Sequence, residues 1–100
     1  MTLEILKLYC DIVRLRSFSQ GAAANQISQS AASQAIQQLE ADLDVQLLDR
    51  TKRPFTVTPE GRVFYEACRD LLDRYAQARA RIASAGTRLD GTVRVWAGRR

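Results

Sequence analysis

Two helical patterns separated by a short polar turn occupy residues 17–43, which read SFSQGAAANQISQSAASQAIQQLEADL. Ser17 or Ser19 suits the N-cap of the first helix, because a serine oxygen accepts hydrogen bonds from the free N–H groups of a first turn. The small residues of 21–27 let another helix approach closely. The apolar residues of 30–43 recur every three or four positions, as in an amphipathic helix. We therefore predict two short helices joined by a polar turn.

The second of these helices has an apolar side and a polar, uncharged side. Its apolar side is formed by Ala32, Ala35, Ile36, Leu39 and Leu43. Its polar side, near the N-terminal end, is formed by Ser30, Ser33, Gln34 and Gln37. Two short helices of this kind are typical of a helix-turn-helix unit, whose second helix reads bases. The spacing alone also allows a generic three-helix bundle whose polar residues are only solvated.

The flanking segments predict a mainly α fold. An amphipathic pattern predicts a helix over residues 2–16. Pro54 restricts Arg53 and favours a turn, and residues 55–58 alternate apolar and polar side chains as a strand does. Two short strands within 48–58 therefore form a β-wing. The expected fold is a winged helix-turn-helix with three helices and a two-stranded wing, followed by a long linker helix.

The long helix is predicted from Pro59 to about Thr87, with Thr58 as its cap. Apolar residues recur along it at spacings of four and three, at Phe64, Cys68, Leu71, Tyr75, Ala78, Ile82 and Ala85. The small preceding domain cannot cover such a heptad seam along its whole length. We therefore expect a second copy of the chain to cover it in a homodimer. The alternative is that the seam packs inside its own domain.

Positive charge is concentrated in the second half of the chain. Residues 1–49 contain 3 Lys/Arg and 6 Asp/Glu, whereas residues 50–100 contain 12 and 5. The net charge of +4 favours a polyanionic partner such as nucleic acid. Since the second helix of the helix-turn-helix unit lies in the acidic half, we predict that basic residues elsewhere supply the electrostatic attraction.

The composition argues against catalysis and against metal binding. The chain has no histidine and only two cysteines, Cys10 and Cys68, which is too few for a zinc site of the usual Cys/His kind. It also lacks the histidine base of a serine or cysteine nucleophile. We predict no enzyme activity, no catalytic residue, no metal and no cofactor. Both cysteines lie in helical patterns and are interpreted as small buried apolar residues.

The two ends of the chain carry separate expectations. The N-terminus enters a helical pattern directly, and no apolar run approaches the ~20 residues of a membrane helix. We therefore expect a cytoplasmic, nucleoid-associated protein without a secretion signal and without a membrane partner. At the other end, Gly86 and Gly91 predict a linker and residues 92–96 predict a strand. Residues 89–100 are interpreted as the start of a truncated effector domain or as a tail.

Four stretches in order resemble the N-terminal DNA-binding domain of LysR-type transcriptional regulators, over residues 1 to about 95. They are SFS with its alanine-rich helix, SQSAASQ at 28–34, LEADLDVQLLDR at 39–50 and TVTPEG at 56–61. The resemblance implies a DNA-binding domain at 1–58, with the helix-turn-helix at 18–37 and the wing at 48–58, and a dimerisation helix at 59–88. It also implies double-stranded operator DNA as partner, a possible tetramer in a full-length protein, and a small-molecule inducer only if an effector domain is present.

The resemblance implies that the helix at 30–43 enters the major groove and that Arg53, at the wing tip, reaches toward the minor groove. Gln34 and Gln37 can each donate and accept at the edge of adenine, so we expect a bias to A·T-containing half-sites. Arg50 either braces the wing or meets a phosphate. The predicted DNA-binding residues are Ser17, Ser19, Gln20, Gln29, Ser30, Ala31, Ser33, Gln34, Gln37, Arg50, Lys52 and Arg53.

Some positions depart from the family's pattern. Asn25 stands where leucine is usual, so we expect the first helix of the unit to pack less firmly. Ser30 stands where proline is common, and Asp44 where glycine is usual. Residues 34, 37 and 38 are glutamines where arginine or lysine is common. This neutral helix keeps open a dimeric protein-interaction module that no longer binds DNA, and a different winged-helix family is a further alternative.

Overall fold

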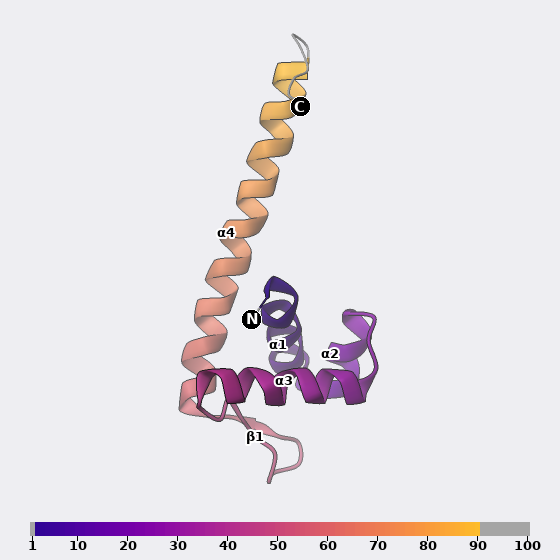
Figure 1. The fold of residues 1–100 in the computed structure, drawn as a ribbon, viewed down its shortest axis with the longest axis vertical. Helices are drawn as coiled ribbons and strands as arrows, with labels where there is room; N and C mark the ends of the chain where they lie inside the picture. Colours follow the sequence, from indigo (N-terminus) through magenta and orange to yellow (C-terminus); the bar gives the residue numbers. More distant parts are fainter. Residues whose placement is uncertain (1, 91–100) are drawn as a thin grey trace.

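The computed structural model describes residues 2–90, and the side chains of residues 2–85. Four helices and a two-stranded antiparallel sheet follow one another along the chain (Figure 1). The elements are α1 (Leu3–Leu15), α2 (Phe18–Ala24), α3 (Gln29–Leu43), β1 (Leu48–Asp49), β2 (Thr56–Val57) and α4 (Pro59–Asp90). This architecture confirms the expected winged helix-turn-helix with a long fourth helix. The strand expected at 92–96 lies outside the described residues.

Side-chain caps fix where the helices begin. Ser17 Oγ accepts a hydrogen bond from Gln20 N at 3.0 Å, and Ser28 Oγ accepts one from Ala31 N at 3.1 Å. Thr58 Oγ1 accepts from Gly61 N at 2.9 Å, so the predicted cap of α4 is confirmed. At its other end α3 stops at Asp44, whose φ of 56° is the left-handed conformation expected there.

The bounds of two helices, α2 and α4, differ from those expected from the sequence. The helix expected over 21–27 begins earlier, at Phe18, and ends at Ala24, because Ser17 caps it and Gln26 adopts a left-handed φ of 60°. The Asn25 amide donates back to Gly21 O at 2.9 Å at this end of α2. At the far end, α4 continues through Gly86 to Asp90, so the linker expected to begin at Gly86 was wrong.

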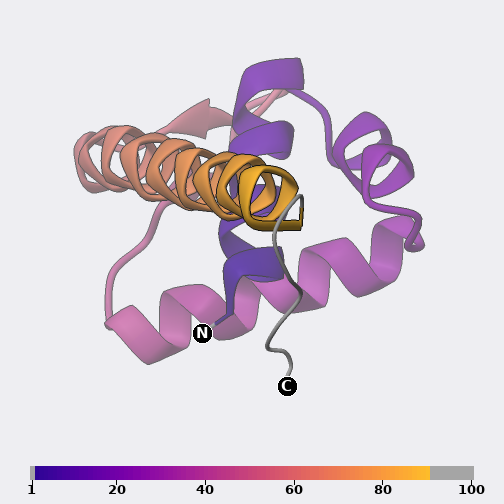
Figure 2. The same cartoon turned by 90° about the horizontal axis from the view of Figure 1, so that it is seen from above.

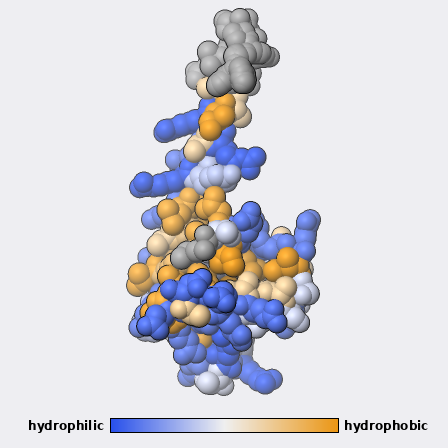
Figure 3. All heavy atoms as spheres, in the orientation of Figure 1, coloured by the Kyte–Doolittle hydropathy of each residue, from blue (hydrophilic) through white to orange (hydrophobic). Residues whose placement is uncertain are grey.

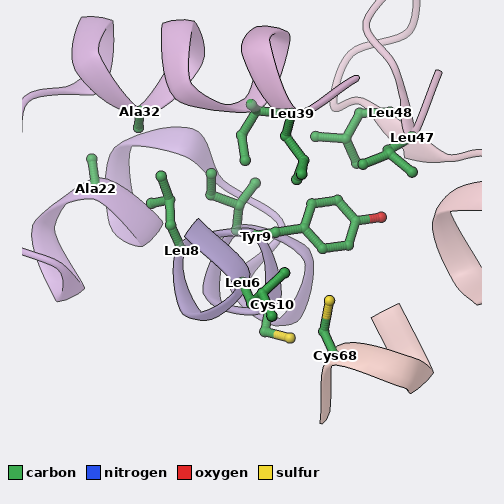
Figure 4. Packing of buried hydrophobic residues seen from close by; sticks show 12 residues of the cluster. Leu6, Leu8, Tyr9, Cys10, Ala22, Ala32, Leu39, Leu47, Leu48 and Cys68 are labelled. Carbon is green, nitrogen blue, oxygen red and sulfur yellow. The ribbon is translucent and has the colours of Figure 1, made fainter. Parts of the chain in front are cut away.

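Helix α1 lies at the centre of the domain and contacts each of the other three helices (Figure 2). Its Tyr9 and Ile12 are fully buried, and they pack with Ile36 and Leu39 of α3 and with Leu48 of the wing. Figure 4 shows Tyr9, Leu39 and Leu48 converging from α1, α3 and the wing segment. Burial of this apolar surface is the main source of the domain's stability.

Two glycines permit close approaches that hold the core together. A Cβ atom at Gly21 would lie 2.5 Å from Ile12 Cγ1, so α1 and α2 could not pack at this distance with a larger residue. A Cβ atom at Gly61 would overlap the Leu47 carbonyl oxygen. The Gly61 carbonyl oxygen in turn accepts a hydrogen bond from the Tyr9 hydroxyl at 2.7 Å. These contacts dock the first turn of α4 against α1 and the wing.

The remainder of α4 projects away from the other helices (Figure 1). Its first turns pack on α1 through Phe64, Tyr65, Cys68 and Leu72. Beyond Leu72 its side chains, up to Ser84, are exposed in the chain. None of the described helices is long and apolar enough to cross a membrane.

Candidate nucleic-acid interface

The N-terminal part of α3 presents uncharged polar side chains to solvent. Gln29, Ser30, Ala31, Gln34 and Gln37 are exposed, and Ser33 is half-buried. Among the residues that the structure describes, the side chains of Gln34 and Gln37 form no hydrogen bond, so their amides are free for another molecule. Ala32 is fully buried and belongs to the core, as predicted. The face can therefore donate and accept hydrogen bonds but carries no charge.

Gln38 differs from the other glutamines of α3. Its Nε2 donates to Asp42 Oδ1 at 3.0 Å along the same helix, in an i to i+4 pair. The amide of Gln38 is therefore engaged inside the chain. It provides a natural control for Gln34, since both residues are exposed glutamines of one helix.

The start of α2 presents a second group of predicted contacts. The Ser17 oxygen caps the helix, and Ser19 and Gln20 are exposed beside it. An exposed helix start offers backbone N–H groups and small side chains to a phosphate. The predicted residues of α2 thus lie where an anion could reach them.

The wing is a short hairpin with a basic tip. Leu48 pairs with Val57 and Asp49 with Thr56, and Lys52 and Arg53 are exposed in the turn between the strands. Neither cation forms an ion pair within residues 2–85. Asp49 accepts hydrogen bonds from the Thr51 backbone and hydroxyl, which lower the pKa of its carboxyl group and shape the turn.

Arg50 braces the wing against the helices, which is one of its two expected roles. Its Nη1 donates to Glu40 Oε1 at 3.1 Å, and its guanidinium lies 5.3 Å from the centre of the Phe18 ring. The Nε and Nη2 atoms are buried in the chain without a hydrogen-bond partner. The Arg50 side chain is 30% exposed. The structure thus shows the bracing contact of Arg50, and a contact of Arg50 with a phosphate stays a prediction.

Glu40 is a positioning residue that sequence reasoning missed. Its Oε2 accepts hydrogen bonds from Leu47 N at 2.8 Å and Leu48 N at 3.1 Å, in addition to the pair with Arg50. The rings of Phe18 and Phe55 meet edge to face at 5.3 Å. Glu40 and these rings therefore join α3, the start of α2 and the wing into one unit.

A polar network supports the other end of the helix-turn-helix unit. The Asp11 carboxylate, 8% exposed as a residue, accepts from Lys7 at 2.9 Å, from Asn25 at 2.9 Å and from Arg14 at 3.1 Å. Burial is the largest influence on the pKa of Asp11 and raises it, but these hydrogen bonds together outweigh burial and lower the pKa. Asn25, expected to loosen α2, instead bonds it to α1.

A basic groove lies between the end of α1, β2 and the start of α4. It has a volume of about 400 Å³, and Arg14, Arg16 and Arg62 line it without any acidic side chain among its described lining residues. Arg16 directly precedes the Ser17 cap. Sequence reasoning missed this cluster, since only folding brings Arg62 beside Arg16.

The predicted seam of α4 divides into two parts. Cys68 is fully buried in the core of its own chain, so the alternative of packing inside the domain applies to this residue. Phe64 packs half-buried against the same core, and its place in a dimer stays a prediction. Leu71, Tyr75 and Ile82 are 52%, 48% and 72% exposed. Ala78 is exposed and Ala85 half-buried. Figure 3 shows apolar surface where α4 leaves the body of the domain.

No group of three or more potential metal ligands occurs within the described part of the chain. The arrangement is that of a winged helix-turn-helix domain: a neutral polar helix face, an exposed helix start and a cationic wing joined to a long projecting helix. Residues 3–62 match the family model described as "Bacterial regulatory helix-turn-helix protein, lysR family". The chain therefore belongs to the LysR family of bacterial regulatory proteins.

Curated relatives agree with this assignment. The chain is 38% identical over 95 residues to the nitrogen assimilation regulatory protein nac of Klebsiella aerogenes, and 37% identical over 98 residues to the transcriptional regulator BenM of Acinetobacter baylyi. In each comparison 95% of this chain matches 31% of the relative. The chain thus spans about a third of the length of these relatives.

Solved structures share the fold. The DNA-binding domain of BenM in complex with catB site 1 DNA superposes with a TM-score of 0.79 at 39% identity, over 85% of this chain and 95% of that one. The CbnR DNA-binding domain in complex with DNA gives a TM-score of 0.78 at 29% identity, over 85% and 98%. Both similar domains are therefore seen bound to DNA.

Proposed function

We propose that this chain is the DNA-binding part of a transcription regulator that binds double-stranded operator DNA as a homodimer. The observation that carries the proposal is the free, uncharged amide face of α3 beside the exposed cations of the wing. Two similar domains, those of BenM and CbnR, were solved in DNA complexes, which supports the same partner here. Nothing in the site favours an enzyme reaction, and the relatives are named as regulators.

In this proposal α3 enters the major groove with its N-terminal end. Gln34 and Gln37 each offer a donor and an acceptor, the pair of groups that matches the N6 and N7 atoms of adenine. No arginine or lysine lies in α3 to pair with guanine. Half-sites bound by this chain should therefore contain A·T pairs opposite these two glutamines.

Affinity comes from the basic residues around that face. Arg53 and Lys52 reach the minor groove and its phosphates, because a narrow A·T-rich groove has an enhanced negative potential. Ser17, Ser19 and Gln20 hold a phosphate at the start of α2. Arg16 and Arg62, in the basic groove, extend the same cationic surface. Because other elements supply the positive charge, α3 can read bases although it lies in the acidic half of the sequence.

The homodimer forms through the exposed part of α4. Leu71, Tyr75, Ala78 and Ile82 lie on its outer surface, and burying them against a second copy of the helix would remove their apolar area from water. The buried Cys68 is excluded from that interface. Assembly into a tetramer and binding of a small-molecule inducer would both require an effector domain in addition to the DNA-binding domain.

Fluorescence anisotropy of duplexes chosen by binding-site selection tests the proposal. A selected duplex should bind more tightly than random DNA, with affinity falling steeply as salt rises. Arg53→Ala should weaken this binding. Arg74→Ala removes one positive charge from the exposed surface of α4 and serves as the control, with binding unchanged. Equal binding of selected and random duplexes at low salt would refute sequence-specific recognition.

One rival function is supported by a specific feature, the absence of charge on α3. A protein-interaction module would use the same amide face to bind another protein. The same titration separates the two functions, because an interaction module would show no salt-dependent binding to any duplex.

A further inference from the structure

The two cysteines of the chain meet where α1 packs on α4. Cys10 lies on α1 and is 8% exposed, and Cys68 lies on α4 and is fully buried. Both are free thiols. Figure 4 shows the two side chains near each other where α1 faces α4, and they are close enough for a side-chain hydrogen bond. They are 58 positions apart in sequence, so only the fold makes them neighbours.

Access to the two sulfurs is unequal. An open groove of about 760 Å³ runs between α1 and α4, and Cys10 lines it together with Arg14 and Arg69. Cys68 is absent from that lining. A small oxidant entering the groove therefore meets Cys10 first.

The chemistry of the pair has the same asymmetry. The Cys68 thiol is placed to donate a hydrogen bond to the Cys10 sulfur, which lowers the pKa of Cys10, and Arg69 acts in the same direction. That hydrogen bond, together with burial, raises the pKa of Cys68. Because a thiolate is the nucleophile in thiol chemistry and Cys10 alone of the two lines the groove, we assign Cys10 as the attacking sulfur and Cys68 as the resolving one.

We propose that Cys10 and Cys68 are an oxidation site, which peroxide converts into a disulfide that joins α1 to α4 within one chain. The Cys10 thiolate attacks one oxygen of hydrogen peroxide; an S–O bond forms, the O–O bond breaks, and the released hydroxide takes up a proton as water. The Cys68 sulfur then attacks the Cys10 sulfur; an S–S bond forms, and the S–O oxygen leaves with the Cys68 proton as a second water. The two thiols lose two electrons, which reduce the peroxide.

The disulfide would fasten the start of α4 to the centre of the domain. Cys68 lies just before Leu71, the first of the exposed seam residues. A covalent bond at this point holds the direction in which α4 leaves the domain. It also restricts the unfolded chain, because it closes a long loop between α1 and α4.

Peptide mapping after peroxide treatment tests the proposal on the folded protein. Trypsin separates the two cysteines into residues 8–14 and residues 63–69. We expect both free thiols to be lost, a cross-linked pair of these two peptides to appear, and the midpoint of thermal unfolding to rise until a reductant is added. Disulfides between chains, oxidation without a cross-link, or a cross-link formed only in denaturant would overturn the proposal.

Two single variants test the order of the steps. In Cys68→Ala, dimedone should trap a sulfenic acid at Cys10, because no resolving thiol remains. In Cys10→Ala, Cys68 should react with peroxide more slowly than Cys10 does in the first variant, since it lies outside the groove. Faster reaction of Cys68 would overturn the assigned order. Peptide mapping of the wild-type chain decides the main proposal even if either variant fails to fold.

Discussion

The recognition face of α3 and the tip of the wing use opposite chemistry on one small domain. The α3 face offers amides and hydroxyls without charge, whereas the wing offers Lys52 and Arg53 without an acidic partner in the described residues. Amides can distinguish base edges, and cations bind any phosphate. The difference teaches that, in the proposed DNA complex, sequence discrimination and electrostatic affinity would come from two separate elements, which Glu40 joins.

The largest expected effect is a loss of stability when the contacts between Glu40 and the wing are removed. Glu40→Ala removes the acceptor for two backbone N–H groups and leaves the Arg50 guanidinium unpaired. We expect a loss of about 3 kcal/mol in the free energy of unfolding, measured by urea denaturation. Glu40→Gln keeps an acceptor for the N–H groups, so its free energy of unfolding should fall by less. Equal stability of Glu40→Ala and wild type would show that the wing does not depend on this residue.

Removing the charge of the wing should lower affinity without changing the base preference of α3. Arg53→Ala should weaken binding to a selected duplex by about 2 kcal/mol, and should reduce the salt slope by about 1 per wing on every duplex. Anisotropy titrations at several salt concentrations measure both quantities, with Arg74→Ala as the unaffected control. A changed preference at the base pairs opposite Gln34 or Gln37 in Arg53→Ala would contradict the separation of the two roles.

Removing one amide from α3 should act on discrimination alone. Gln34→Ala should lose about 1 kcal/mol of preference at a single base pair, with an unchanged salt slope. Competition with duplexes substituted one pair at a time measures this. Gln38→Ala, whose amide is engaged with Asp42, should keep the wild-type preference. If both variants behave alike, the α3 face does not read bases.

The smallest expected effect is on the pH dependence of stability, through the Asp11 network that joins α1 to α2. The pKa of Asp11 is lowered in the folded chain, so its ionised form contributes stability above the ordinary aspartate pKa of about 3.9. That contribution is lost as the pH falls through the lowered pKa of Asp11. Unfolding free energies should therefore differ between wild type and Asp11→Asn at pH 6 and converge in acid. A difference that stays constant with pH would exclude this role.

Local chemistry explains what the sequence could predict. Thr58, Ser28 and Ser17 act as caps because their oxygens bond to N–H groups only three residues away. The stop at Asp44 and the wing turn also depend on neighbours in sequence. The family resemblance added the helix-turn-helix assignment, which the family model over residues 3–62 confirms.

Contacts between distant residues explain what the sequence could not predict. The role of Asn25 in joining α2 to α1 depends on its bond to Asp11, and the role of Glu40 depends on the wing folding back onto α3. The burial of Cys68 against Cys10 is another case, since heptad spacing alone does not say which helix covers a seam. The predicted DNA contacts remain predictions, to which the structure adds Arg16 and Arg62.

Thr58 is the one residue between the end of β2 at Val57 and the start of α4 at Pro59. Its hydroxyl donates to Gln46 O at 2.6 Å and its backbone N donates to Leu47 O at 3.0 Å, so this junction has no slack. The wing and the start of α4 are consequently fixed to each other at Thr58. In the proposed DNA complex, the direction of α4 and the position of the wing tip would thus be set together by this one junction.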